Sequence, residues 1–195
     1  MSDKSKESKL MDNAVIYLSG EISPATSERI CTQIIQLNIE GKHPFIQMLI
    51  DSPGGSLYAT FSIIDMMGWS ALPIYTTGIG LIASGALMIL MAGSKGHRVL
   101  TPSTSIMSHR FGGMSMGNYS DMLAKRAQED LLHKRAVDLY IRCTKVKTAA
   151  EVESKLLKDT DCWLTPEEAL KYGICDSIHE GHLKEATRDK AQATR

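Results

Sequence analysis

Short apolar runs alternate with helical stretches along the first half of the chain, and this alternation restricts the fold more than any other feature of the sequence. Residues 15–18, 45–50 and 73–77 have the length and composition of buried strands. Apolar residues recur at helical spacing between them, within residues 24–41 and 57–67. Strands that alternate with helices form a mainly parallel sheet with helices packed on it. The sequence therefore predicts an α/β fold.

The longest apolar stretch, residues 79–92, is too short to cross a bilayer, because a spanning helix needs about 20 residues. Ser84 and Gly85 interrupt it, so we expect a buried core helix over residues 84–91. Short strands are expected at residues 98–100, 105–107 and 174–178. Capping residues mark the ends of further helices, namely Ser23 with Gly41, Thr148 with Glu151 in a capping box, and Thr165 with Gly173.

A long amphipathic helix is predicted over residues 119–142, where Leu123, Leu131 and Leu139 lie on or near one face. This helix carries more apolar surface than a peripheral helix of a single domain needs, and several methionines lie close by in the sequence. We therefore expect a large homo-oligomer that buries this surface. The alternative is that the helix belongs to the core of a monomer.

The chain has 195 residues, of which 43% are hydrophobic, and this is enough for one domain with a sizeable core. We expect one domain over residues 11–180, between a polar tail of residues 1–10 and a charged tail of residues 181–195. Lys+Arg and Asp+Glu both total 22, so the chain has no excess of positive charge that would indicate binding to nucleic acid. The N-terminus lacks the apolar core of a secretory signal, and we expect a cytoplasmic protein that does not act on membranes.

The four cysteines form no C-x-x-C pair, which favours reduced thiols packed as small hydrophobic side chains over a disulfide or a metal site. His179 and His182 belong to an H-E-G-H segment, but a solvated tail explains this segment better than metal binding. We therefore expect neither a metal nor another cofactor.

Ser84 is the first candidate for chemistry, because it stands alone among small and apolar residues where a strand leads into a helix. A helix N-terminus offers unpaired N–H groups and a positive dipole end. The N–H group next to Ser84 is therefore well placed to stabilise the oxyanion of an acyl transfer. On this segment alone, the better interpretation is a small residue that permits close helix packing.

Three further segments complete a candidate catalytic set. Residues 51–56, Asp-Ser-Pro-Gly-Gly-Ser, can expose backbone N–H groups to an anion, although an ordinary strand-to-helix turn has the same composition. His109 ends a strand, where open α/β sheets carry catalytic groups, and Asp161 precedes a helix. Taken alone, each of these two side chains is more often a plain surface residue. Together they predict a triad in which His109 takes the Ser84 proton and Asp161 orients the imidazolium.

The chain resembles the proteolytic subunit of the Clp protease (ClpP) from about residue 15 to residue 178. The resemblance is carried, in the same order, by residues 51–56, 80–84, 92–98, 107–109 with 112–113, 161–169 and 172–178. It implies a serine triad of Ser84, His109 and Asp161, with the N–H groups of Gly55 and Gly85 as the oxyanion hole. It also implies a crotonase-like α/β fold, in which ββα units form a spiral with a protruding handle helix.

The same resemblance implies a serine endopeptidase that assembles as stacked rings, usually two rings of seven subunits. The sites would face an inner chamber, and a Clp-type ATPase would feed unfolded polypeptide into it. The helix over residues 119–142 and the segment 112–117 would form the handle that joins the rings.

The sequence departs from the family pattern around the site. Gly85 replaces the usual methionine after the nucleophile, which keeps the N–H donor but lowers local stiffness. His109-Arg110-Phe111 replaces His-Gln-Pro, and this segment is one residue shorter before the glycines. Thr160 replaces the arginine that usually precedes the aspartate, which affects contacts between rings.

The surface that docks the ATPase departs further. Gln47 and Leu49 stand where the family has tyrosines, and the 14 residues before Val15 contain no apolar run for a pore-lining hairpin. Aromatic anchors dominate interface energetics, and an amide that must be desolvated weakens an apolar pocket. We therefore expect weak docking or a different docking surface, unless Phe45 and Met48 repack to supply apolar area.

Two other functions compete with the peptidase. A catalytically idle ring subunit would typically lack one member of the triad, and all three are present here. A crotonase-fold acyl-CoA enzyme would also use two backbone N–H groups as an oxyanion hole, and the fold alone does not exclude it. A nucleophile with a matching base and acid favours the peptidase.

Overall fold

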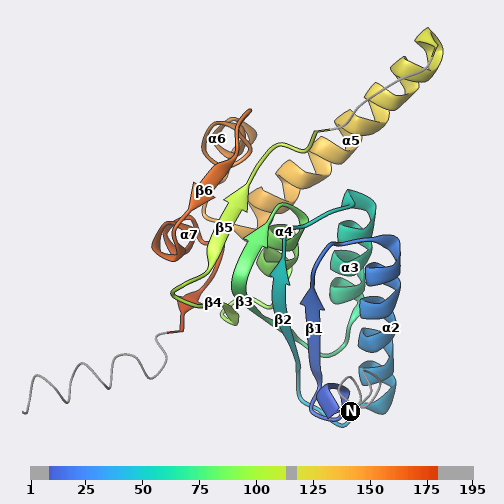
Figure 1. Ribbon diagram of the computed structural model, residues 1–195, viewed down its shortest axis with the longest axis vertical. Helices are drawn as coiled ribbons and strands as arrows, with labels where there is room; N and C mark the ends of the chain where they lie inside the picture. Colours follow the sequence, from blue (N-terminus) through green and yellow to red (C-terminus); the bar gives the residue numbers. More distant parts are fainter. Residues whose placement is uncertain (1–8, 113–117, 180–195) are drawn as a thin grey trace, which may run out of the picture.

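A mainly parallel sheet forms the centre of the computed structural model, which describes residues 9–112 and 118–179 (Figure 1). β5 (Ser105–Ser108) pairs in parallel with one strand of this sheet, and β6 (Cys162–Leu164) pairs antiparallel with β5. The predicted α/β class is confirmed. The parallel strands lie in the order β1 (Val15–Ser19), β2 (Ile46–Ser52), β3 (Ile74–Ala83), β4 (Arg98–Leu100) and β7 (Ser177–Ile178).

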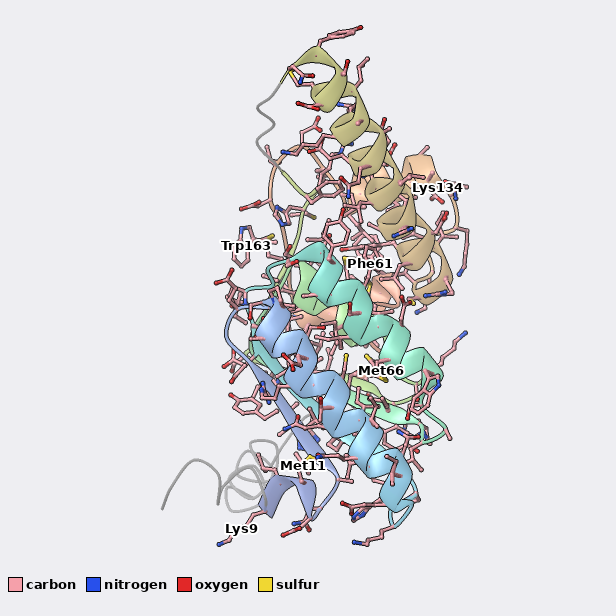
Figure 2. The ribbon with its side chains drawn as sticks, turned by 90° about the vertical axis from the view of Figure 1, so that its right-hand side faces the viewer. Lys9, Met11, Phe61, Met66, Lys134 and Trp163 are labelled. Carbon is pink, nitrogen blue, oxygen red and sulfur yellow. The ribbon has the colours of Figure 1, made fainter. Side chains whose placement is uncertain are left out.

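Helices cover one face of the sheet. α2 (Pro24–Glu40) and α3 (Leu57–Trp69) lie side by side next to β1 and β2 (Figures 1 and 2). α4 (Gly85–Ala92) packs against β3 and β2 on one side. On its other side it contacts α5 (Tyr119–Cys143). α6 (Ala149–Lys155) and α7 (Pro166–Tyr172) lie near β5 and β6 on the other flank.

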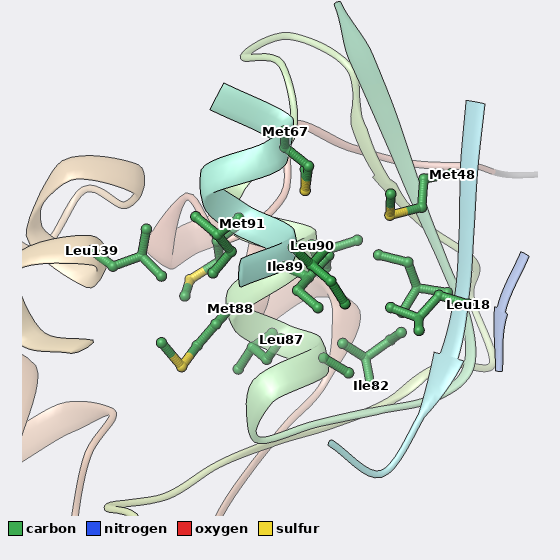
Figure 3. Close-up of a cluster of buried hydrophobic side chains, with 14 of the residues drawn as sticks. Leu18, Met48, Met67, Ile82, Leu87, Met88, Ile89, Leu90, Met91 and Leu139 are labelled. Atoms are coloured by element: carbon green, nitrogen blue, oxygen red, sulfur yellow. The ribbon is translucent and has the colours of Figure 1, made fainter. Parts of the chain in front are cut away.

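The core lies between the sheet and these helices because the strands alternate strictly. In β2, Ile46, Met48 and Ile50 are fully buried, whereas Gln47 and Leu49 face the side without helices and are half-buried. α4 is buried all round, and Figure 3 shows its apolar side chains between the strands, α3 and α5. This confirms the buried core helix that the sequence predicts after Ser84.

Most of the predicted helix ends are confirmed. Ser23 caps α2 by accepting a hydrogen bond from Thr26 N at 3.2 Å, and Gly41 ends the helix in the left-handed region at φ 59°. Thr165 begins α7 with a complete capping box. The predicted box at Thr148 is not complete, because Glu151 accepts a hydrogen bond from the Thr148 hydroxyl and not from its backbone N–H.

Two strands differ from the prediction in length, β3 and β7, and β7 covers only Ser177–Ile178 where a strand is expected over residues 174–178. β3 continues six residues beyond the predicted end at residue 77, because its second half pairs with β5 while its first half pairs with β4. Only the second half of α5 packs on the core: Leu139 is 3% exposed, but Leu123 and Leu131 are 53% and 59% exposed. Most of the predicted segment 112–117, residues 1–8 of the N-terminal tail, the C-terminal tail and His182 lie outside the described residues.

Candidate active site

Ser84 occupies a sharp turn between β3 and α4. Its backbone has φ 54° and ψ −120°, values that residues other than glycine rarely adopt. The turn is fixed by a hydrogen bond from Ser84 N to Met107 O at 2.9 Å and by one from Leu87 N to Ser84 O at 3.1 Å. Such strain costs about 1–3 kcal/mol and is concentrated at functional sites, so the turn favours a chemical role over a simple packing role for this serine.

His109 reaches the serine because their strands are neighbours. β5 pairs with the end of β3, with Met107 opposite Ala83, so each strand places its next residues at the same edge of the sheet. His109 Nε2 lies 2.9 Å from Ser84 Oγ, which is the distance of a hydrogen bond between a base and a nucleophile. The structure therefore brings together the first two residues of the sequence-predicted triad.

Asp161 lies on the far side of the same imidazole. It immediately precedes β6, whose Cys162 pairs with Ser108 of β5, and this antiparallel register sets Asp161 beside His109. The distance from Asp161 Oδ1 to His109 Nδ1 is 3.7 Å, which is an ion-pair separation and longer than a hydrogen bond. The three predicted residues thus lie in the order serine, histidine and aspartate.

The loop with Gly54 and Gly55 lies against the serine turn. A Cβ atom on Gly54 would come within 2.7 Å of Ser84 Cβ and 2.8 Å of Gly85 N, so this approach requires glycine. Gly55 is bridged to Ile22 through its neighbours: Ile22 N donates to Gly54 O, and Ser56 N donates to Ile22 O. The N–H group of Gly55 therefore points away from Ile22, and no described residue accepts a hydrogen bond from it.

Gly85 is the first residue of α4, and its N–H group has no acceptor among the described residues. A Cβ atom on Gly85 would collide with Thr60 Oγ1. Thr60 is fully buried, and its hydroxyl donates to Ser56 O at 2.9 Å, so it cannot rotate away without losing this bond. The glycine after the nucleophile is thus explained by Thr60, a residue for which the sequence contains no recognisable signal.

Two ion pairs near the catalytic base also have no signal in the sequence. Arg110 Nη1 lies 3.0 Å from Asp159 Oδ1, and His133 Nε2 of α5 lies 2.9 Å from Glu153 Oε1 of α6. The hydrogen bond from His133 lowers the pKa of Glu153. The partners in each pair are at least twenty residues apart in the sequence. The pairing of β5 with β6 brings Arg110 and Asp159 together, and the packing of α5 on α6 does the same for His133 and Glu153.

The remaining predictions concern thiols, metals and membranes. All four cysteines are free, and burial raises the pKa of the Cys175 thiol to about 11. Within residues 9–112 and 118–179, no three His, Cys, Asp or Glu side chains are grouped as metal ligands. No helix in the described part of the chain is long and apolar enough to cross a membrane.

Comparison with known proteins places this arrangement in one family. The family model described as Clp protease matches residues 2–182. An ATP-dependent Clp protease proteolytic subunit of Deinococcus radiodurans is 32% identical over 173 residues, which cover 88% of this chain and 82% of the relative. The subunit of the same name from Porphyromonas gingivalis is 34% identical, with 91% and 78% covered. Subunit 1 of Leifsonia xyli is 35% identical, with 90% and 87% covered.

Proposed function

The chain belongs to the Clp protease family of serine peptidases, and we propose that Ser84, His109 and Asp161 carry its chemistry. The observation that supports this assignment most strongly is the 2.9 Å contact between Ser84 Oγ and His109 Nε2 at a strained turn. The substrate is an unfolded polypeptide, and the reaction is hydrolysis of an internal peptide bond.

In this proposal, His109 Nε2 accepts the hydroxyl proton of Ser84 while Oγ attacks the carbonyl carbon of the scissile bond. The tetrahedral intermediate then expels the amine, which receives that proton from His109, and an acyl-enzyme ester remains on Ser84. A water molecule gives a proton to His109 and attacks the ester. Return of the proton to Oγ releases the carboxylic acid and restores Ser84.

Asp161 holds the imidazole by its Nδ1 side and stabilises the imidazolium that forms in each half-reaction. Its present distance of 3.7 Å is longer than a hydrogen bond, and catalytic hydrogen bonds often tighten only when substrate binds. We therefore expect this contact to shorten in the acylating complex.

The N–H groups of Gly55 and Gly85 form the oxyanion hole in this proposal. Both lack an acceptor among the described residues, and the Gly54 contacts show that their two segments lie against each other at Ser84. Backbone donors at a helix N-terminus are fixed before reaction, so they stabilise a developing oxyanion without rearrangement.

The subunit self-associates in this proposal, as two stacked rings of seven. The first half of α5 projects from the rest of the fold (Figure 1), and it exposes Tyr119, Met122, Leu123 and Leu131. Large apolar side chains on an unsupported helix favour burial against a partner. Stacked rings would cover these side chains and enclose the catalytic sites in a chamber.

A Clp-type ATPase is the proposed partner, and it docks weakly on the helix-free face of the sheet. Gln47 Nε2 donates to Thr77 Oγ1 at 3.1 Å, so its amide is already engaged within the sheet. Met48 is fully buried in the core (Figure 3) and cannot supply apolar area on this face. Of the two residues that could repack to replace the missing tyrosines, only Phe45 therefore remains. Phe45 is stacked on Tyr75, with ring centroids 4.4 Å apart.

Docking is tested with a purified Clp-type ATPase. Losing one aromatic anchor costs about 2 kcal/mol or more, so we expect weak retention of the ATPase by the homo-oligomer and little ATP-dependent protein degradation. Tight binding with full degradation, unchanged by a Gln47→Ala substitution, would contradict weak docking.

Peptidase kinetics test the triad itself. Ser84→Ala and His109→Ala should each lower kcat/KM for a fluorogenic peptide by several orders of magnitude, and Asp161→Ala by less. Ser105→Ala, an exposed serine of β5, is the matched control and should retain wild-type turnover. Most of the activity surviving in Ser84→Ala would refute the assignment. Absence of peptide cleavage by the wild type would favour the idle subunit or the acyl-CoA enzyme.

A further inference from the structure

A small cavity lies directly beside the serine and the histidine, and we call it the acyl pocket. Its volume is about 20 Å³. The side chain of the residue whose carbonyl is attacked by Ser84 must lie next to Oγ, and this pocket is the space available there. Ser84 and His109 form one side of it, and the side chains of Phe111, His133 and several core residues form the others.

Four walls of the acyl pocket belong to the hydrophobic core, namely Met88, Ala136, Tyr140 and Leu157. Met88 and Ala136 are each 4% exposed, as is Leu157. Tyr140 is 1% exposed, and its hydroxyl is hydrogen-bonded to Ser108 Oγ at 2.7 Å. Moving any of these side chains would disrupt the close packing of the core.

Among the apolar walls, Phe111 alone belongs neither to the core nor to the side chains packed against it. It lies two residues after His109, in a segment without regular structure, and it is half-buried. Its ring rests against the imidazole of His133, with centroids 6.3 Å apart and planes at 48°. His133 is itself held by Glu153, because its Nε2 lies 2.9 Å from Glu153 Oε1. The contact with His133 therefore keeps the Phe111 ring over the pocket.

The volume limits what the pocket accepts. At about 20 Å³, the acyl pocket is far smaller than four other cavities of the described chain, whose volumes are about 350–740 Å³ on the same scale. The side chains of leucine and phenylalanine carry four and seven carbon atoms, and Phe111 in its present position narrows the space left for them.

We propose that Phe111 restricts cleavage to peptide bonds that follow alanine or a residue of similar size. The inference rests on the proposed peptidase function, because only an acylating peptide places a side chain in this pocket. Phe111 acts here as a specificity-determining residue: it excludes larger side chains and leaves the Ser84 and His109 contact intact.

The test uses the assembled full-length protein and fluorogenic peptides that differ only in the residue before the scissile bond: alanine, valine, leucine or phenylalanine. The wild type should cleave after alanine at least about tenfold more efficiently than after leucine, since each misfitting methylene in a pocket costs about tenfold or more. Phe111→Ala should raise the leucine-to-alanine ratio of kcat/KM at least about tenfold, and Phe111→Val should raise it by less.

Phe61→Ala is the matched control. Phe61 is also half-buried, but it lines a groove between α3 and α5 and not the acyl pocket. This variant should leave the ratio unchanged. Thermal unfolding of all three variants separates a loss of fold from a change of preference, and Phe111→Val carries the test if Phe111→Ala does not fold.

Labelling of Ser84 by a fluorophosphonate separates this inference from the function on which it rests. If Ser84 is labelled but the wild type cleaves after leucine as well as after alanine, the inference is wrong and the peptidase function stands. The same holds if the Phe111 variants leave the ratio unchanged. If the wild type is neither labelled nor active on any of the four peptides, the proposed function fails, and this inference fails with it.

Discussion

Thr60 and Gly85 share one small space beside Ser84, the proposed nucleophile. Because Thr60 Oγ1 lies too close to the position of a Gly85 Cβ, Gly85→Ala should displace the start of α4 and the N–H group that we propose for the oxyanion hole. Overpacking of this kind costs about 1–3 kcal/mol in stability, and misplacement of the donor lowers the rate of Ser84 acylation. Fluorophosphonate labelling rates measure the effect.

Combining Gly85→Ala with Thr60→Ala should relieve this collision. Thr60→Ala removes the atom that collides with Cβ, while the Thr60 Cβ itself stays at an ordinary 3.4 Å. The rate at which a fluorophosphonate labels Ser84 in the double variant should therefore be within a few-fold of the rate in Thr60→Ala. It should be far higher than the rate in Gly85→Ala alone. Equal rates for Gly85→Ala and the wild type would show that this space is not filled as described.

At the scale of elements, the sequence predicts what is local and misses what depends on pairing. The apolar run of residues 45–50 and the caps at Ser23 and Thr165 are local signals, and all are confirmed. The extension of β3 is not local: Gly80 sits against the Asp51 carboxylate, which accepts a hydrogen bond from Leu81 N at 3.0 Å. Only the folded sheet supplies that partner.

The candidate site follows the same division. The sequence predicts Ser84, His109 and Asp161 as a set, from residue type, chain order and the family resemblance, although none of the three is distinctive when taken alone. Thr60 and His133 leave no such signal, since a buried threonine and a helical histidine are common. Their relation to the site depends on how α3 and α5 pack.

One ion pair joins several elements and gives a pH prediction. Arg98 is 4% exposed, pairs with Asp176 at 2.6 Å, and also donates to the last turns of α4 and α5 through Met91 O and Cys143 O. Burial raises the pKa of Asp176, but the hydrogen bonds from Arg98 outweigh burial and hold the pKa below its ordinary value.

Because the folded pKa of Asp176 is depressed, its contribution to stability is present above the unfolded value of about 3.9 and is lost as pH falls through the folded value. Asp176→Asn should destabilise the protein by about 3 kcal/mol at pH 7, because it leaves Arg98 buried without its counter-ion. The difference from the wild type in unfolding experiments should shrink below about pH 4. A difference that is constant from pH 7 to pH 3 would exclude this origin.

At the scale of the whole molecule, the proposed assembly depends on the projecting half of α5. In that proposal Leu131→Lys or Leu123→Lys places a charge in the interface between rings, so each should lower the mass found by light scattering, toward single rings or smaller species. Ile39→Lys is the control, since Ile39 is also exposed, at 78%, but belongs to α2. A wild type that scatters only as a 21.4 kDa chain would contradict assembly.

The central claim is that Ser84 is a nucleophile activated by His109, and covalent labelling measures this most directly. The assembled protein is treated with a fluorophosphonate, and the site of modification is located by mass spectrometry of its peptides. We expect one adduct per subunit, on Ser84, strongly slowed by His109→Ala and absent from Ser84→Ala. An unmodified Ser84, or an adduct that forms equally fast in His109→Ala, would contradict the account.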